Sequence, residues 1–187
     1  GLPRGGPPAT RLRALPGDPL KNADELETGQ EITGEVVNVT QFGARLDIGM
    51  DRPGWISVAQ VQEEFIEDLT AVLSIGDEVR ARVKTVKDRE VQVSARIDSP
   101  IWKKRRPLDF KKGEVVQGEV VQVSKAAVFV DVGAMVDAYL PGDQVRPGGE
   151  KPDNLRELFD KGMQLEAKVL QSGPCKLTLT LRTDVDV

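Results

Sequence analysis

The stretch Gly29-Gln-Glu-Ile-Thr-Gly-Glu-Val-Val-Asn-Val39 returns later in the chain as Gly113-Glu-Val-Val-Gln-Gly-Glu-Val-Val-Gln-Val123. The register then continues without a gap, so that Asp47-Ile48-Gly49 matches Asp131-Val132-Gly133. Self-similarity over such a length indicates two copies of one structural unit.

Each copy predicts five short β-strands, so the expected fold class is all-β. In the first copy, the strands are rich in β-branched residues or alternate apolar with polar residues. Apolar residues spaced through residues 60–73, Phe65 among them, predict a short helix between strands three and four that plugs one end of a barrel. This order is the plan of the five-stranded OB (oligonucleotide-binding) barrel. The predicted strands are Ile32–Val39, Ala44–Gly49, Gly54–Val58, Glu78–Val86 and Val91–Arg96.

The composition of the flanking segments predicts the domain organisation. Residues 1–24 are rich in glycine and proline and are expected to form a disordered arm, because they carry too little apolar surface to fold alone. Residues 25–97 form the first predicted barrel, residues 98–111 a basic linker, and residues 112–183 a second, divergent barrel.

The composition also argues against an enzyme. The chain has no histidine and a single cysteine, Cys175. The commonest general base and the commonest metal ligand are therefore missing. We expect no catalytic residues, no metal and no cofactor. The sequence lacks an apolar run long enough to predict a membrane span.

The motifs of the first copy resemble the S1 RNA-binding domain. They are Gly34-x-Val36-x-x-Val39, Phe42-Gly43-Ala44-x-Leu46-Asp47-Ile48-Gly49, Gly54-Trp55-Ile56, Gly76-Asp77-x-Val79 and Val91-x-Val93-Ser94. The second copy, from Gly113 to Arg182, resembles the same family in a more divergent form. The resemblance implies tandem S1-type barrels that bind single-stranded RNA through aromatic stacking and basic contacts.

The resemblance assigns two aromatic positions to RNA binding, and each copy keeps one of them. Phe42 meets the first position, where the second copy has Ala126. Phe129 meets the second position, where the first copy has Arg45. Phe42 is expected to stack on a base, or else to cover the barrel mouth. Arg45 is expected to stack or contact phosphate, or to remain a solvated surface residue.

The resemblance implies further polar contacts. Ser57 and Pro141 occupy the position of the family's usual histidine on strand three. Asp88 meets the acidic position before strand five. Lys176 meets the basic position that opens this strand, and Arg89 meets it in the first copy if the turn slides by one place.

The sequence also predicts whether three aromatic side chains are exposed or buried. Period two places Phe129 outward, where it would contact RNA or a neighbouring protein. Trp55 and Tyr139 stand at equivalent positions where the family usually has a leucine-like core residue, so both are expected to be buried.

The predicted linker gathers positive charge, although the whole chain has a net charge of −4. Trp102 adjoins the run Lys103, Lys104, Arg105 and Arg106, which would bind phosphates by releasing counterions. The alternative is a solvated linker with no partner.

These features favour a non-catalytic protein that binds single-stranded RNA in translation or transcript handling. Its expected partners beside RNA are the ribosome, RNA polymerase or another large protein assembly. The alternative is a docking subunit whose barrels bind protein, in an organelle or elsewhere. Because the chain starts at Gly1, a processed organellar protein and a fragment of a longer chain are both open. The expected compartment is an organelle matrix such as the chloroplast stroma, or else the bacterial cytoplasm.

Overall fold

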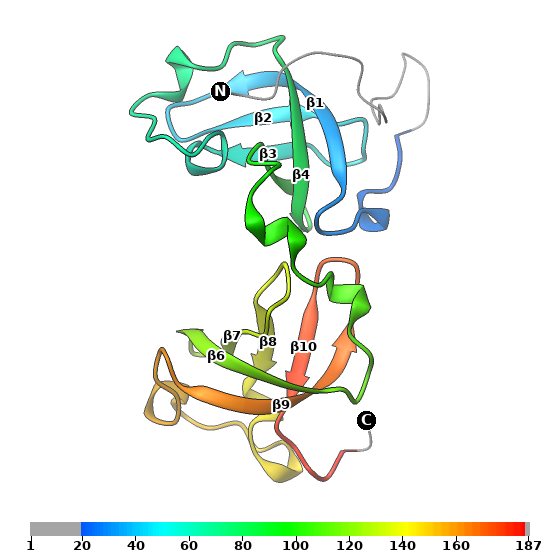
Figure 1. Cartoon of the computed structure of the whole chain (residues 1–187), viewed down its shortest axis with the longest axis vertical. Helices are drawn as coiled ribbons and strands as arrows, with labels where there is room; N and C mark the ends of the chain where they lie inside the picture. The colour runs from blue at the N-terminus through cyan, green and yellow to red at the C-terminus, as the bar shows by residue number, and fades with distance from the viewer. Residues whose placement is uncertain (1–19, 186–187) are drawn as a thin grey trace. The chain divides into compact units, whose positions relative to one another are not determined.

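The computed structural model describes residues 20–185 and contains two closed five-stranded barrels, as the sequence predicts (Figure 1). The chain divides into two compact units between Trp102 and Lys103. The first barrel has the strand order β1-β2-β3-β5-β4. Its strands are β1 (Glu31–Val39), β2 (Gly43–Asp47), β3 (Gly54–Ser57), β4 (Glu78–Val86) and β5 (Val91–Ser94).

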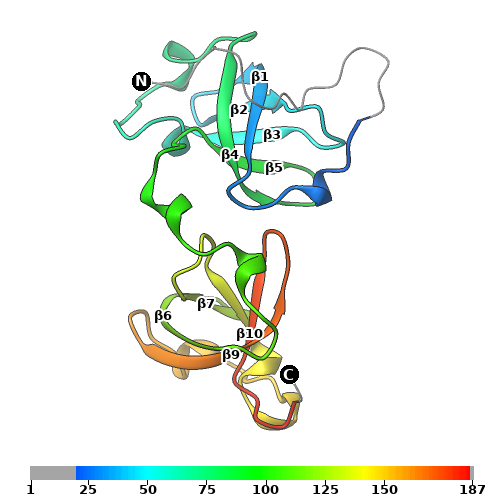
Figure 2. The same ribbon diagram turned by 45° about the vertical axis from the view of Figure 1, so that its right-hand side comes forward.

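Alternation of side chains builds the interior of the first barrel. Along β4, Val79, Ala81 and Val83 are fully buried. Arg80 and Arg82 lie between them and point outward, because successive residues of a strand face opposite sides of a sheet. The parallel pairing of β3 with β5 closes the barrel, and Figure 2 labels all five strands.

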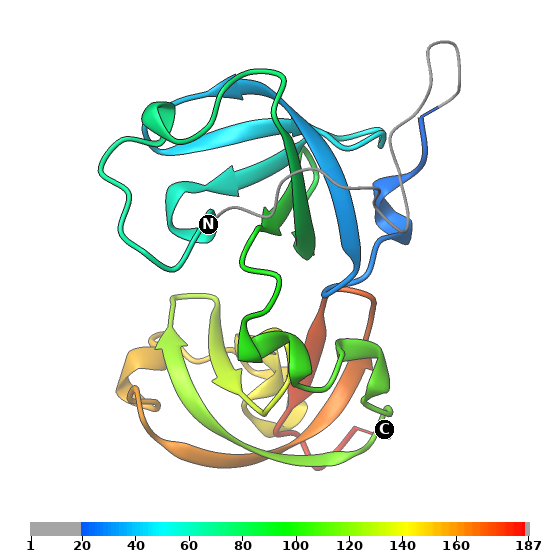
Figure 3. The ribbon, with the colours of Figure 1, turned by 45° about the horizontal axis from the view of Figure 1, so that its top comes forward.

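The second barrel repeats this plan with the order β10-β8-β7-β6-β9. Its two long strands, β6 and β9, run side by side as the light green and orange strands of Figure 3. Gly162 before β9 has φ +92°, and Gly76 before β4 has φ +94°. Both sites need a left-handed backbone, so the duplication extends to the turns. The strands are β6 (Val115–Val123), β7 (Ala127–Asp131), β8 (Ala138–Pro141), β9 (Gln164–Ser172) and β10 (Leu177–Thr180).

The predicted helix between strands three and four is two single 3₁₀ turns. In the first barrel these are η2 (Val58–Gln60) and η3 (Leu69–Ala71). Asp68 caps η3 by accepting hydrogen bonds from the Thr70 backbone N–H and hydroxyl, at 3.0 and 2.7 Å. This cap starts a separate turn at Leu69, so no single helix runs through the connection. Phe65 is 91% exposed and does not close the end of the barrel.

In both barrels, apolar residues of the connection between the third and fourth strands close one end of the core. In the first barrel these residues are all buried; they are Val61, Ile66, Leu69 and Leu73. Leu155 and Phe159 play the same role in the second barrel, within its own apolar core. The turns of this connection are η6 (Gly142–Gln144), η7 (Pro147–Gly149) and η8 (Leu155–Glu157).

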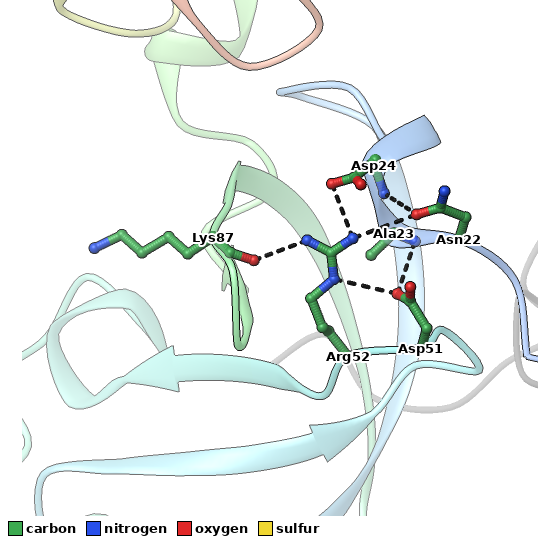
Figure 4. Close-up of polar contacts among 6 residues, drawn as sticks. All are labelled: Asn22, Ala23, Asp24, Asp51, Arg52 and Lys87. Atoms are coloured by element: carbon green, nitrogen blue, oxygen red, sulfur yellow. Dashed lines mark hydrogen bonds and ion pairs between the residues drawn. The ribbon is translucent and has the colours of Figure 1, made fainter.

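The segment before the first strand, from Leu20 to Glu25, overlaps the end of the predicted arm. Turn η1 (Ala23–Glu25) packs on the first barrel, with Ala23 fully buried. Arg52 binds Asn22, Asp24, Asp51 and the Lys87 carbonyl oxygen, which ties this segment to the β4–β5 turn (Figure 4). The rest of the predicted arm, residues 1–19, lies outside the described residues.

The segment predicted as a linker contains two turns, η4 (Pro100–Lys103) and η5 (Pro107–Asp109). The indole N–H of Trp102 donates to the Arg96 carbonyl oxygen at 2.8 Å. The backbone of Arg105 forms an isolated parallel β-bridge with the backbone of Ala134. Local contacts therefore fix each end of this segment to its own barrel.

Candidate nucleic-acid interface

Four facing residues form an outer row across the first barrel. Asn38 on β1 lies opposite Arg45 on β2. Arg45 lies opposite Trp55 on β3, and Trp55 lies opposite Gln92 on β5. Directly opposed side chains share one face of a sheet, so these four make a continuous polar and aromatic surface. Their strand neighbours Ala44, Leu46 and Ile56 are fully buried on the inner face.

Trp55 belongs to this outer row, so the expectation that it is buried in the core was wrong. Its side chain is half-buried and alternates with Ile56, which takes the core position. The indole ring lies over Gly43: a Cβ on Gly43 would overlap the ring and sit 2.7 Å from the Ile56 carbonyl oxygen. The absence of a side chain at Gly43 thus makes room for the ring.

Phe42 projects from the turn that joins β1 to β2, and 68% of it is exposed. The Thr40 hydroxyl oxygen accepts from the Phe42 and Gly43 backbone N–H groups at 3.2 and 3.3 Å. The Phe42 carbonyl oxygen accepts from the Val58 N–H at 2.8 Å. Hydrogen bonds to Thr40 and Val58 therefore fix the backbone that carries the ring, and the exposed ring is accessible to a stacking partner.

The second barrel carries an equivalent outer row with different chemistry. Gln122 on β6 lies opposite Phe129 on β7, which lies opposite Tyr139 on β8. Tyr139 in turn faces Thr178 on β10. Tyr139 is half-buried on the outer face, so its expected core position was also wrong.

Phe129, Tyr139 and Lys176 form a compact cluster on this face. The rings of Phe129 and Tyr139 pack edge to face with centroids 5.7 Å apart. The Lys176 ammonium lies 4.8 Å from the Tyr139 ring centroid, within cation–π range. Two rings and one cation thus share a single surface.

The other positions assigned by resemblance lie at opposite ends of the first barrel, with Ser57 next to the β1–β2 turn and Asp88 and Arg89 next to the β2–β3 loop. Ser57 is partly exposed and pairs with Gly43. Asp88 and Arg89 are exposed in the β4–β5 turn. Glu90 takes the place that Lys176 holds in the second barrel, and its carboxylate accepts from Gln92 at 3.2 Å. The two barrels therefore carry opposite charges at this position.

Part of the basic run is neutralised by neighbouring carboxylates. Arg105 binds Glu114 at 2.8 Å and its guanidinium stacks 3.8 Å from the Phe110 ring centroid. Hydrogen bonds from Arg105 hold the pKa of Glu114 below its usual range. Arg106 binds Asp109 at 3.0 Å. Lys103 and Lys104 are exposed, and Lys104 approaches Asp131 only to 3.9 Å.

Carboxylates limit each outer face at the end away from the β1–β2 or β6–β7 turn. Glu35 lies opposite Asp47 on the first barrel, and Glu119 lies opposite Asp131 on the second. A polyanion that approached this end would meet two like charges. These carboxylates disfavour nucleic acid at this end, where Lys176 brings a cation to the face of the second barrel.

Sequence reasoning missed Trp55, Tyr139, Asn38 and Gln122 as members of these surfaces. The signal was present for Trp55, because it stands between Gly54 and Ile56, and period two puts both of those inward. The residues opposite it depend on strand register, which the sequence does not specify by itself.

Comparison with known proteins identifies the two barrels. A family model described as the S1 RNA binding domain matches residues 25–96 and 109–171. The small ribosomal subunit protein bS1 of Staphylococcus epidermidis is 28% identical over 149 residues, which are 79% of this chain and 37% of that protein. The bS1 protein of Streptococcus pneumoniae is 25% identical over 149 residues, 79% of this chain and 36% of that protein. The chain thus spans less than two-fifths of these relatives.

Two solved structures match about two-fifths of the chain each. GSP13 from Bacillus subtilis is 25% identical with a TM-score of 0.37, and the match covers 42% of this chain and 61% of that one. The intact alpha subunit of aIF2 from Pyrococcus abyssi is 23% identical with a TM-score of 0.35, and covers 39% of this chain and 29% of that one.

Within residues 20–185, the Cys, Asp and Glu side chains do not gather in any group of three or more that could hold a metal ion. The same residues include no helix long and apolar enough to cross a membrane.

Proposed function

Because the chain belongs to the S1 RNA-binding domain family, we propose that it binds single-stranded RNA on the outer face of both barrels and performs no chemistry on it. The observation that carries the proposal is the pairing of outward aromatic rings with a cation on each face. On the first barrel these are Phe42 and Trp55 with Arg45; on the second they are Phe129 and Tyr139 with Lys176.

The energetics of such a surface suit a strand without fixed sequence. Stacking of a base on an aromatic ring contributes about 1–3 kcal/mol per base and tolerates any base. Arg45 and Lys176 add phosphate contacts or cation–π contacts beside the rings. Ser57 lies next to the β1–β2 turn and would contact a ribose or a base edge, and Asp88 and Arg89 would contact RNA that extends to the opposite end of the barrel.

The run next to Trp102 contributes a weaker electrostatic part of the proposal. Lys103 and Lys104 provide its exposed ammonium groups, whereas Arg105 and Arg106 form ion pairs with Glu114 and Asp109. We therefore assign phosphate binding in this segment chiefly to the two lysines, through counterion release. Trp102 orients the segment through its hydrogen bond to Arg96.

Translation is the process that the relatives favour. Both bS1 proteins are ribosomal by name, and the match extends over both barrels of this chain. We infer that the chain works on RNA in association with the ribosome. Both relatives come from bacteria, which favours the bacterial cytoplasm over the chloroplast stroma.

A docking role is the second candidate, and Phe65 is the observation that favours it. This ring is 91% exposed and stands in the sequence between Glu63, Glu64, Glu67 and Asp68. Glu63 pairs with Arg96, and the other three carboxylates disfavour RNA, so a partner for this ring would be a protein.

Titration with a fluorescent single-stranded RNA of about 20 nucleotides tests the main proposal. Phe42→Ala should weaken binding by about fivefold or more, because one stacked base is lost. Lys103→Gln combined with Lys104→Gln should weaken binding mainly at low salt.

The matched control is Phe65→Ala, which removes a still more exposed ring from an acidic surface. It should leave RNA affinity unchanged. An absence of wild-type binding at low salt, where electrostatic attraction is strongest, would overturn the proposal.

A further inference from the structure

An open groove of about 570 Å³ lies on the second barrel, next to the outer row. One wall is the end of β6 and the other is the segment between η8 and β9. Its lining residues are Val121, Gln122, Val123, Arg156, Phe159, Asp160 and Lys161. Among these lining residues, Gln122 alone belongs to the outer row.

The groove walls combine positive charge with an apolar base. Arg156 and Lys161 are both exposed, and neither forms an ion pair within residues 20–185. Phe159 is 8% exposed and belongs to the apolar core of this barrel. Asp160 is the one carboxylate among the lining residues. Two cations above an apolar base suit a phosphodiester with its sugar.

The groove is held in place by backbone hydrogen bonds. The Gly162 N–H donates to the Val120 carbonyl oxygen at 2.7 Å, and the Val120 N–H donates to the Met163 carbonyl oxygen at 2.8 Å. Asn154 caps η8 by accepting from the Arg156 N–H at 3.1 Å. The cationic wall is thus tied to β6, so little ordering would be needed on binding.

Gln122 joins the groove to the aromatic cluster. It lines the groove and lies directly opposite Phe129 across the β6–β7 pair. Opposed Cβ atoms in such a pair are about 5 Å apart, which is less than the spacing of successive phosphates in an extended strand. A strand stacked on Phe129 would therefore pass into the groove within one nucleotide.

The first barrel lacks these charges at the matching positions. Gly76 and Gly162 align, and the caps Asp68 and Asn154 align in the same register. In this register Thr70 stands in place of Arg156, and Ile75 in place of Lys161. The cations are therefore a property of the second barrel and not of the shared fold.

We propose that this groove is a phosphate-binding subsite that takes the RNA backbone as the strand leaves the Phe129–Tyr139 cluster. The inference rests on the proposed RNA-binding function and makes the second barrel the stronger electrostatic site. Arg156 and Lys161 each neutralise one phosphate.

The test is salt-dependent titration of the full chain with a fluorescent oligouridine of about 20 nucleotides. For single strands, the slope of log K against log salt changes by about 0.7 for each phosphate neutralised. Arg156→Gln with Lys161→Gln should therefore lower the magnitude of the slope by about 1.4 and weaken binding by about tenfold at low salt. Arg156→Lys with Lys161→Arg should keep both the slope and the affinity.

The matched control is Lys112→Gln with Lys168→Gln. This pair removes the same charge near the start of β6, where Val115 pairs with Lys168. It should change the slope by less than half as much. If the wild type binds RNA but the groove variant matches this control, the subsite is overturned while RNA binding stands. If the wild type does not bind, the proposed function itself fails.

Discussion

A single missing side chain shapes the outer face of the first barrel. The indole ring of Trp55 lies against Gly43, and Gly43 directly follows the exposed Phe42 in the sequence. The two rings therefore flank one short stretch of backbone. Any side chain at position 43 would displace the indole ring and alter the surface offered to a base.

Gly43→Ala should lower the free energy of unfolding by about 1–3 kcal/mol, because an added methyl group overpacks a filled site. It should also shift the tryptophan fluorescence of the folded protein. Urea unfolding followed by tryptophan fluorescence measures both effects. Gly173→Ala is the control, because a Cβ at Gly173 would meet only the Lys176 carbonyl oxygen at 3.8 Å. An equal loss in both variants would contradict the overpacking at Gly43.

At the residue scale the sequence predicted some of the site and misplaced the rest. Phe129 was predicted outward from period two, and it is partly exposed on the outer face. Trp55 was assigned to the core by its place in the family motif, although the alternation around it indicated the surface. The pairing of Arg105 with Glu114 was missed because it depends on how the chain folds back before β6.

At the scale of elements, the strands follow directly from the sequence, whereas the connection between β3 and β4 does not. Apolar and polar residues alternate along β4, and the same series of strand patterns occurs twice, so the strands can be predicted although their register cannot. The buried residues Val61, Ile66 and Leu69 instead have uneven spacing, and the cap at Asp68 starts a new turn. The short helix predicted here is present as separate 3₁₀ turns, because apolar spacing alone does not tell one continuous helix from capped 3₁₀ turns.

Arg52 is the side chain that joins three elements of the first barrel, as Figure 4 shows. Arg52→Gln should lower the unfolding midpoint and speed amide hydrogen exchange both near Ala23 and in the β4–β5 turn. The control is Arg80→Gln, which removes only a surface ion pair with Glu31. Exchange that changes at one of the two segments alone would contradict a shared anchor.

The same cluster predicts a dependence on pH. The Ala23 N–H hydrogen bond, followed by the hydrogen bond from Arg52, holds the pKa of Asp51 below its usual range. A carboxyl whose pKa is lowered by folding stabilises the folded state above its unfolded pKa, and this contribution is lost as the pH falls through the folded pKa. The difference in unfolding midpoint between wild type and Arg52→Gln should therefore shrink from about pH 7 to about pH 3. If the difference in unfolding midpoint stays constant with pH, the Asp51 carboxylate does not contribute to the stabilisation by Arg52.

At the scale of the whole molecule, the two barrels share one topology and differ in surface chemistry. The repeat and the motifs predicted the paired barrels, because buried alternation and turn glycines are fixed by the fold. The outer rows are not fixed in this way, since a solvent-facing position accepts Arg45 in one barrel and Phe129 in the other. The duplication therefore keeps the scaffold while the two faces offer different residues to the proposed RNA ligand.

Two faces on one chain should bind a long RNA more tightly than either face alone, because the second contact becomes intramolecular. Replacing Phe129 and Tyr139 by alanine should weaken binding of an RNA of about 20 nucleotides by tenfold or more, since linkage can contribute about 10²–10⁴ in affinity. The same variant should bind an RNA of about six nucleotides nearly as well as wild type does, because the first barrel still offers Phe42, Arg45 and Trp55 to an RNA that occupies one face. Titrations with both lengths separate these cases. Equal losses for the two lengths would mean that the second barrel carries most of the binding alone, and equal retention for both would mean that Phe129 and Tyr139 do not contact RNA.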